Sequence, residues 1–156
     1  MLHRSAGSGR FESSVLAVFD DYVPAFGAGD FDGDGDVDVL ADGSERVWFL
    51  VNRGNGRFEP RVEGTKTDAE RIVAADVNGD ARLDIVVGAE YSSEDARWPG
   101  ELRVRLNRGD WEFSRPELLA KPRTLLAVAD LDGDGRSDFV VDDIPDVLVL
   151  RSVECG

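Results

Sequence analysis

The stretch that decides the fold is D-F-D-G-D-G-D-V-D at residues 30–38. Two further nonapeptides align with it, D-V-N-G-D-A-R-L-D at residues 76–84 and D-L-D-G-D-G-R-S-D at residues 130–138. All three share the pattern D-x-[DN]-G-D-[GA]-x-x-D, and each leads into an apolar run. Self-similarity at a spacing of about 50 residues is typical of repeat architectures. We therefore expect three structural units of one kind.

A second motif repeats in step with the nonapeptides and consists of an apolar run, a turn and a phenylalanine. The two complete turns are N-R-G-N-G-R-F at residues 52–58 and N-R-G-D-W-E-F at residues 107–113. The third apolar run, at residues 147–151, has no such turn after it. Residues 4–11, R-S-A-G-S-G-R-F, form a degenerate copy of that turn. The third unit is therefore interpreted as split between the two termini.

Each unit is expected to contain four short strands. Helical periodicity is weak, and glycine and aspartate interrupt the chain too often for helices. A four-stranded unit repeating about every 40–60 residues indicates a blade of a β-propeller. The sequence thus predicts an all-β chain, with a single partial propeller over residues 1–156. Its units are expected at about 22–60, at about 68–116, and at about 122–156 together with 1–14.

Composition excludes several functional classes. The 156 residues include 32 acidic and 18 basic side chains, and the formal net charge is −14. Proteins that bind nucleic acid or anionic membranes carry a basic face, so both classes are excluded as defaults. The single histidine, His3, and the single cysteine, Cys155, leave no material for an internal disulfide, a His–Cys zinc site or a Ser-His-Asp triad. Residues 1–11 show no secretory signal.

The acidic residues of the nonapeptides alternate in a way that suits a hard divalent cation. A chain wrapped around an ion presents alternate side chains to it, and calcium takes six to eight oxygen ligands. Positions one, three, five and nine offer side-chain oxygens, and position seven offers a backbone carbonyl. The predicted ligands are Asp30, Asp32, Asp34, Asp36 and Asp38, then Asp76, Asn78, Asp80, Arg82 and Asp84, and finally Asp130, Asp132, Asp134, Arg136 and Asp138.

The second nonapeptide departs from the other two. Asn78 replaces an acid and Ala81 replaces a glycine. We expect this loop to bind a cation more weakly or to show a local distortion. An EF-hand is excluded, because it needs a glutamate at position twelve, where this chain has Ala41, Val87 and Val141. The remaining alternative is that Asp, Asn and Gly simply form turns.

The nonapeptides and the turn at residues 52–58 resemble the FG-GAP/VCBS repeats of β-propellers, as in integrin α-subunit heads and many bacterial surface proteins. The resemblance implies blades in which a calcium loop joins the first two strands, with up to three structural Ca²⁺ ions. It also implies ligand binding or adhesion without catalysis, on loops at one face, and an extracellular or cell-surface location.

Three blades are too few for a closed ring, because propellers have roughly four to eight. We expect the chain to associate with itself, as a homodimer that forms a six-bladed ring with two-fold symmetry. In that arrangement Gly9-Arg10-Phe11-Glu12 of one chain completes the C-terminal unit of the other. The alternative is that the missing blades belong to a longer chain.

The ligand is expected to be a glycan or a protein. An insertion over residues 91–100 carries Tyr91 and Trp98, and an aromatic residue on a polar loop is a reasonable ligand site. Two other functional classes stay open. One is a carbohydrate-active enzyme that uses paired carboxylates such as Asp142 and Asp143. The other is a purely structural, self-assembling repeat scaffold. The tripeptide Arg108-Gly109-Asp110 occupies a hairpin turn and is interpreted as structural.

Overall fold

The described part of the chain is built from antiparallel β-strands. The structure, a computed structural model, describes residues 2–5, 11–19, 22–43, 46–54, 56–65, 69, 71–89, 100–122, 124–143 and 145–153. Helices do not occur in these residues. The prediction of an all-β chain is therefore confirmed.

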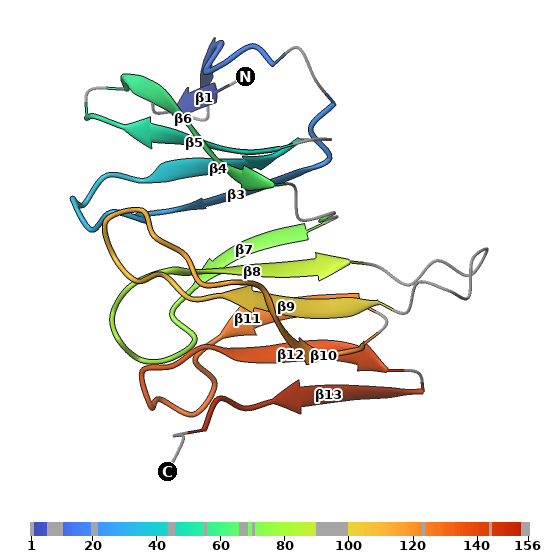
Figure 1. The fold of residues 1–156 in the computed structure, drawn as a ribbon. Helices are drawn as coiled ribbons and strands as arrows, with labels where there is room; N and C mark the ends of the chain where they lie inside the picture. Colours follow the sequence, from blue (N-terminus) through green and yellow to red (C-terminus); the bar gives the residue numbers. More distant parts are fainter. Residues whose placement is uncertain are drawn as a thin grey trace.

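Three sheets stack on one another, and each is formed by strands that are consecutive in the sequence (Figure 1). The first sheet contains β3 (Ala25–Gly29), β4 (Asp38–Asp42), β5 (Arg46–Asn52) and β6 (Phe58–Thr65). The second contains β7 (Arg71–Ala75), β8 (Asp84–Ala89), β9 (Glu101–Arg105) and β10 (Glu117–Ala120). The third contains β11 (Thr124–Ala129), β12 (Asp138–Asp143) and β13 (Asp146–Leu150). The four-stranded antiparallel sheets are consistent with propeller blades, as predicted.

The two N-terminal strands form a separate sheet. β1 (Leu2–Ser5) pairs with β2 (Phe11–Ser14), with Leu2 opposite Ser14. This terminal hairpin lies at one end of the stack, and β13 lies at the other end (Figure 1). The third sheet accordingly has three strands within the described residues. Completion of that sheet by a second chain stays a prediction.

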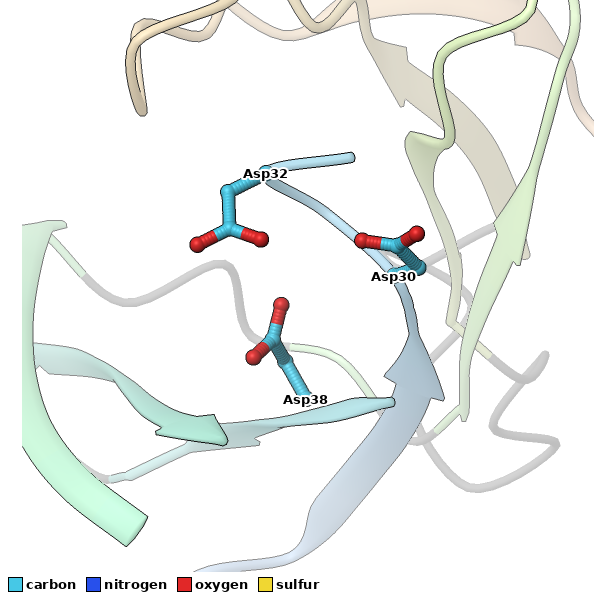
Figure 2. Close-up of side chains that lie close together, drawn as sticks. All are labelled: Asp30, Asp32 and Asp38. Carbon is cyan, nitrogen blue, oxygen red and sulfur yellow. The ribbon is translucent and has the colours of Figure 1, made fainter. Parts of the chain in front are cut away.

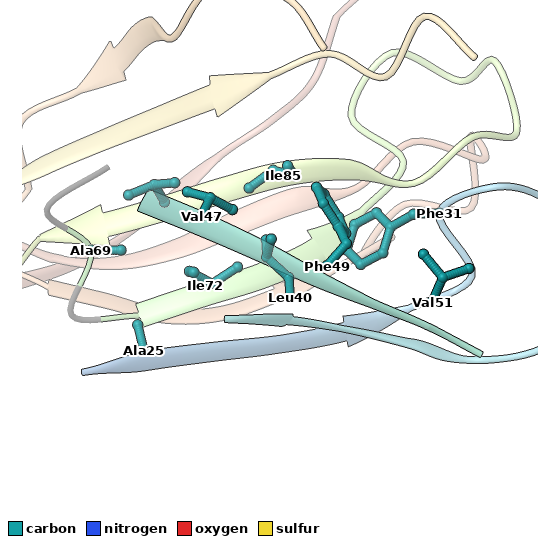
Figure 3. Packing of buried hydrophobic residues seen from close by; sticks show 10 residues of the cluster. Ala25, Phe31, Leu40, Val47, Phe49, Val51, Ala69, Ile72 and Ile85 are labelled. Atoms are coloured by element: carbon teal, nitrogen blue, oxygen red, sulfur yellow. The ribbon is translucent and has the colours of Figure 1, made fainter. Parts of the chain in front are cut away.

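Apolar side chains pack between consecutive sheets. Between the first and second sheets, Phe49, Leu40 and Ile72 belong to one buried cluster (Figure 3). Between the second and third sheets, Leu102, Phe139 and Val141 belong to another. β8 serves both, because Ile85 and Val87 belong to the first cluster and Val86 to the second. Burial of both faces of the second sheet explains why Ile85, Val86 and Val87 of β8 are all apolar rather than alternating with polar residues.

The first strands of the first two sheets approach each other closely at a pair of glycines. A Cβ atom added at Gly27 would lie 2.7 Å from Cγ2 of Ile72. A Cβ atom added at Gly29 would lie 2.7 Å from Cβ of Ala74 and 2.7 Å from Cδ1 of Leu83. Carbon atoms do not pack at that separation, so the spacing of the two sheets depends on the absence of side chains at these positions.

We predict that Gly27→Ala lowers the free energy of unfolding by about 1–3 kcal/mol, because the new methyl overpacks the interface with Ile72. Equilibrium denaturation measures the change. Gly88→Ala is the matched control, since a Cβ there would lie 3.4 Å from Cβ of Leu125, an ordinary contact. A loss for Gly27→Ala no larger than the loss for Gly88→Ala would contradict the interpretation.

Candidate metal centres

Each nonapeptide joins the first and second strands of its sheet, and the three loops lie on the same side of the stack (Figure 1). The first aspartate of each loop organises the backbone in the same way. One oxygen of Asp30 accepts a hydrogen bond from the amide of Gly33 (2.8 Å), and the other accepts from the amide of Gly35 (3.0 Å). Asp76 and Asp130 hold the amides at the matching positions of their loops. The chain therefore curls around this carboxylate.

The ninth aspartate ties each loop to the end of the third strand. Asp38, Asp84 and Asp138 are almost fully buried. One oxygen of each accepts from the amide of the second loop residue, at 3.1 Å for Phe31, 3.0 Å for Val77 and 3.1 Å for Leu131. The other oxygen accepts from the amide of Asn52 (2.8 Å), Asn107 (2.8 Å) or Ser152 (3.1 Å). A buried carboxylate is thus satisfied by two backbone donors.

A polar residue at or just beyond the end of each third strand completes the closure, a role that the motif search did not assign to it. The side-chain amides of Asn52 and Asn107 donate to the carbonyl of the eighth loop residue, Val37 in one case and Leu83 in the other, both at 3.1 Å. In the third unit the hydroxyl of Ser152 donates to the carbonyl of Ser137 at 2.7 Å. Asn precedes Arg-Gly after each of the first two nonapeptides. This recurrence is the feature of the sequence that could have indicated the role.

Two of the loops bring three carboxylates together. Asp30, Asp32 and Asp38 direct oxygens toward one another (Figure 2), and Asp130, Asp132 and Asp138 do the same. In each group the selected oxygens lie within 4.8 Å of one another. Calcium binds oxygen at about 2.3–2.6 Å, so ligands on opposite sides of the ion lie up to about 5 Å apart. Both clusters therefore fit a calcium ion in donor type and in size.

The predicted ligands at positions five and seven lie outside these three-carboxylate clusters. Asp34 accepts from the amide of Asp36 at 2.9 Å, and Asp134 accepts from the amide of Arg136 at 2.8 Å. Arg136 was predicted to offer its backbone carbonyl. Its guanidinium additionally donates to Asp134 at 2.7 Å. These contacts shape the loops around the clusters.

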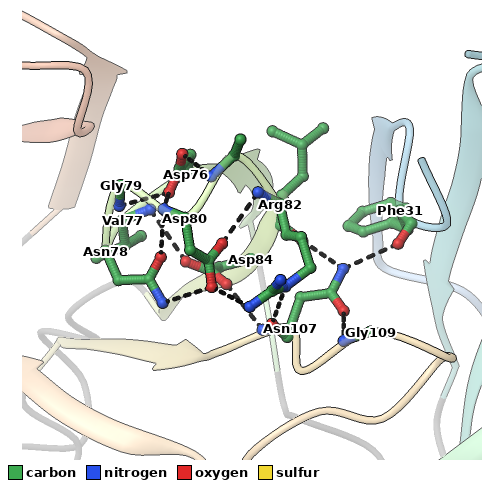
Figure 4. A network of polar contacts seen from close by, with 12 residues as sticks. Phe31, Asp76, Val77, Asn78, Gly79, Asp80, Arg82, Asp84, Asn107 and Gly109 are labelled. Carbon is green, nitrogen blue, oxygen red and sulfur yellow. Dashed lines mark hydrogen bonds and ion pairs between the residues drawn. The ribbon is translucent and has the colours of Figure 1, made fainter.

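In the second loop, side chains of the same loop bind the carboxylate of Asp80 (Figure 4). The guanidinium of Arg82 pairs with the Asp80 carboxylate, and the side-chain amide of Asn78 donates to the same carboxylate at 3.0 Å. Arg82 also donates to the carbonyl of Asn107 at 3.0 Å. Within the described residues, the groups of three acids that suit a metal occur only in the first and third loops. The second loop lacks the third carboxylate of such a group, because Asn78 stands where the other two loops have Asp32 and Asp132.

The charge state of the loops reflects their surroundings. Burial raises the pKa of Asp32 and Asp38 above the ordinary value, and the neighbouring carboxylates add to the effect. Burial likewise raises the pKa of Asp84. Hydrogen bonds from the amides of Gly135 and Gly133 lower the pKa of Asp130. Ionising the carboxylates of the first loop therefore costs free energy, and a bound cation would reduce that cost.

One segment of the chain matches a known family of repeats. Residues 30–87, which run from the first nonapeptide into β8, match a family model described as an FG-GAP-like repeat. The match confirms the resemblance that the nonapeptides carry and supports a β-propeller-like repeat module. A comparison with curated proteins found no match.

Three residues singled out in the sequence lie outside the described part of the chain, and one tripeptide lies within it. Tyr91 and Trp98, the predicted ligand residues, lie outside the described part of the chain, as does Cys155. Arg108, Gly109 and Asp110 form a tight turn, in which the Arg108 amide donates to the carbonyl of Glu112 at 2.8 Å. No helix among the described residues is long and apolar enough to span a membrane.

Ala81 carries the distortion that the sequence of the second loop leads us to expect. Its φ is 63°, in the left-handed region, where Gly35 and Gly135 occupy the matching positions with φ of 91° and 85°. A residue with a Cβ pays about 1–2 kcal/mol in that conformation. We predict that Ala81→Gly raises the free energy of unfolding by about 1 kcal/mol, measured by denaturant titration.

The reverse substitution in the first loop is the matched control. Gly35→Ala is expected to lower stability by a similar amount, because a Cβ there meets no atom within 4 Å and the φ strain alone remains. A loss of stability in Ala81→Gly would contradict this interpretation of the loop.

Proposed function

We propose that the chain is a calcium-stabilised propeller module that binds a glycan or protein ligand without catalysing a reaction. The observation that carries the calcium proposal is the pair of matching clusters, Asp30, Asp32 and Asp38 in the first loop and Asp130, Asp132 and Asp138 in the third. Oxygen-only ligands of this kind favour calcium or magnesium over transition metals. The FG-GAP-like repeat at residues 30–87 supports the same proposal.

The proposed ions are structural. Each cluster includes a ninth aspartate that is bound to backbone amides and buried beneath the loop, so a cation there would join the loop to the core. A metal that binds only the folded chain stabilises it by mass action. At a calcium concentration about 100 times the dissociation constant, each site contributes about 2.7 kcal/mol. We propose two such sites per chain, because the second loop has Asn78 where the other two have Asp32 and Asp132.

Thermal unfolding in calcium and in EDTA tests the proposed sites. The wild-type chain is expected to melt at a higher temperature in calcium. Asp32→Asn and Asp132→Asn each remove a charge while keeping a side-chain oxygen, so each is expected to remove part of the calcium-dependent increase. The double variant should remove nearly all of it. Titration calorimetry with CaCl₂ should give two sites in the wild-type chain and one in each single variant.

Asp110→Asn is the matched control. Asp110 is an exposed carboxylate in a turn outside the nonapeptides, and its φ of 50° is one that asparagine tolerates. This variant is expected to keep the full response to calcium. Identical melting of the wild-type chain in calcium and in EDTA would contradict the calcium proposal.

The proposed binding role follows from the scaffold. Loops held at one side of a rigid sheet stack are common positions for recognition. We propose an extracellular or cell-surface setting, where calcium is abundant enough to fill such sites. The carboxylates of the nonapeptides have structural partners in the loops, which supports a role in folding rather than in catalysis.

A glycan array incubated with the labelled, calcium-loaded chain tests the binding role. We expect a defined group of glycans to retain the protein and to remain intact. Retention of none would restrict the ligand to proteins. Cleavage of an arrayed glycan that is abolished by Asp142→Asn, a carboxylate outside the nonapeptides, would contradict a non-catalytic function and favour a carbohydrate-active enzyme.

A further inference from the structure

The first acidic loop is held by a residue from the second unit. Asn107 lies just beyond β9 and is only 1% exposed. Its side-chain amide donates to the carbonyl of Leu83 at 3.1 Å and to the carbonyl of Phe31 at 2.9 Å (Figure 4). Leu83 belongs to the loop of the second unit, whereas Phe31 belongs to the loop of the first. One side chain therefore joins the loops of two neighbouring sheets.

The corresponding residues of the other two units each hold one loop. The side-chain amide of Asn52 donates to Val37, and the hydroxyl of Ser152 donates to Ser137, each in its own unit. Within the part of the chain that the structure describes, neither side chain donates to the loop of another unit. A carboxamide has two hydrogens to donate and a hydroxyl has one. The contact with Phe31 is therefore an addition to the closure that all three units share.

The carbonyl of Phe31 lies between two residues of the proposed calcium site. Asp30 precedes Phe31 and Asp32 follows it, and both direct carboxylate oxygens toward Asp38 (Figure 2). The peptide bond is planar, so a hydrogen bond to this carbonyl fixes the orientation of the peptide that leads into Asp32. The direction in which the Asp32 side chain starts therefore depends on a donor from the second unit.

The ring of Phe31 is held by both units as well. Its centroid lies 5.2 Å from that of Phe49 in the first sheet and 6.4 Å from that of Phe113 in the second unit. The hydrogen bond to its carbonyl is buried, and a buried acceptor that loses its donor costs free energy. Loss of the Asn107 donor would therefore act on the backbone of the first loop while the ring stays packed.

We infer that Asn107 is a positioning residue for the calcium site of the first loop, so that a residue of the second unit sets the affinity of that site. The inference rests on the proposed calcium function and assigns a role outside the nonapeptides. Outer residues that orient metal ligands change the affinity by about 10–100-fold when they are replaced. Asn107 acts through the backbone rather than on a carboxylate, so we expect an effect of about tenfold, at the lower end of that range.

The effect is reciprocal. Because the second unit raises the calcium affinity of the first loop, calcium in that loop strengthens the attachment of the second unit by the same factor. The first ion therefore stabilises the contact between two sheets as well as its own loop. The third loop differs, since backbone groups tie it to the second loop, from the amide of Ser137 to the carbonyl of Asp76 at 2.7 Å. A side-chain change at Asn107 should leave the third site unaffected.

Calcium titration calorimetry in two single-site backgrounds tests the inference. Asp132→Asn leaves the first site, and Asp32→Asn leaves the third. Asn107→Ser is the test substitution, because Ser152 shows that serine at this position keeps the amide clamp and the contact with its own loop. In the Asp132→Asn background it is expected to raise the calcium dissociation constant about tenfold. In the Asp32→Asn background the dissociation constant is expected to stay the same, which also shows that the variant is folded.

Asn52→Ser in the Asp132→Asn background is the matched control. Asn52 makes the same contacts with its own loop and turn as Asn107 does, without the donation to another unit. This variant is expected to keep the affinity of the first site.

Three results would overturn the inference and leave the calcium proposal in place. They are an unchanged dissociation constant at the first site in Asn107→Ser, an equal loss in Asn52→Ser, and an equal loss at the third site. An Asp132→Asn chain that binds no calcium would instead contradict the proposed first site itself, and the inference with it.

Discussion

The arrangement of this protein depends on a buried carboxylate that binds two backbone amides. Asp38, Asp84 and Asp138 each join the start of an acidic loop to the end of the third strand, two segments that no strand pairing connects. Charged acceptors form stronger hydrogen bonds than neutral ones, and burial makes their loss expensive. The same contact in every unit fixes the first three strands relative to one another, and the sheets stack on units of constant shape.

The three loops differ in how the repulsion between their carboxylates is balanced. Each gathers acidic groups that repel one another without a positive partner. Arg82 pairs with Asp80 in the second loop and Arg136 pairs with Asp134 in the third. Within the described residues, however, the first and third loops alone bring three carboxylates close enough for an external cation. The distinction follows from position three of the nonapeptide, where Asn78 stands in place of an acid. A metal dependence that varies from blade to blade is the expected consequence.

Much of the fold could be predicted from the sequence, because each unit repeats both its loop and its turn. The nonapeptides and the Asn-Arg-Gly turns locate the strands on either side of them, and the four-stranded sheets follow. Other features depend on neighbours in space. The guanidinium of Arg82 reaches Asp80 and the carbonyl of Asn107, which lies just beyond β9. β1 forms by pairing with β2, since strand formation is set by its partner more than by intrinsic preference. Neither contact leaves a signal in the spacing of residues.

Amide hydrogen exchange in calcium and in EDTA tests the central claim most directly. The clamped amides are those of Phe31, Asn52, Val77, Asn107, Leu131 and Ser152. The account predicts that all six exchange slowly in EDTA, because the protein alone supplies the carboxylate partner. Calcium should slow exchange further in the first and third loops and leave Val77 and Asn107 nearly unchanged. Fast exchange of these amides in EDTA, or an equal response to calcium in all three loops, would contradict the account.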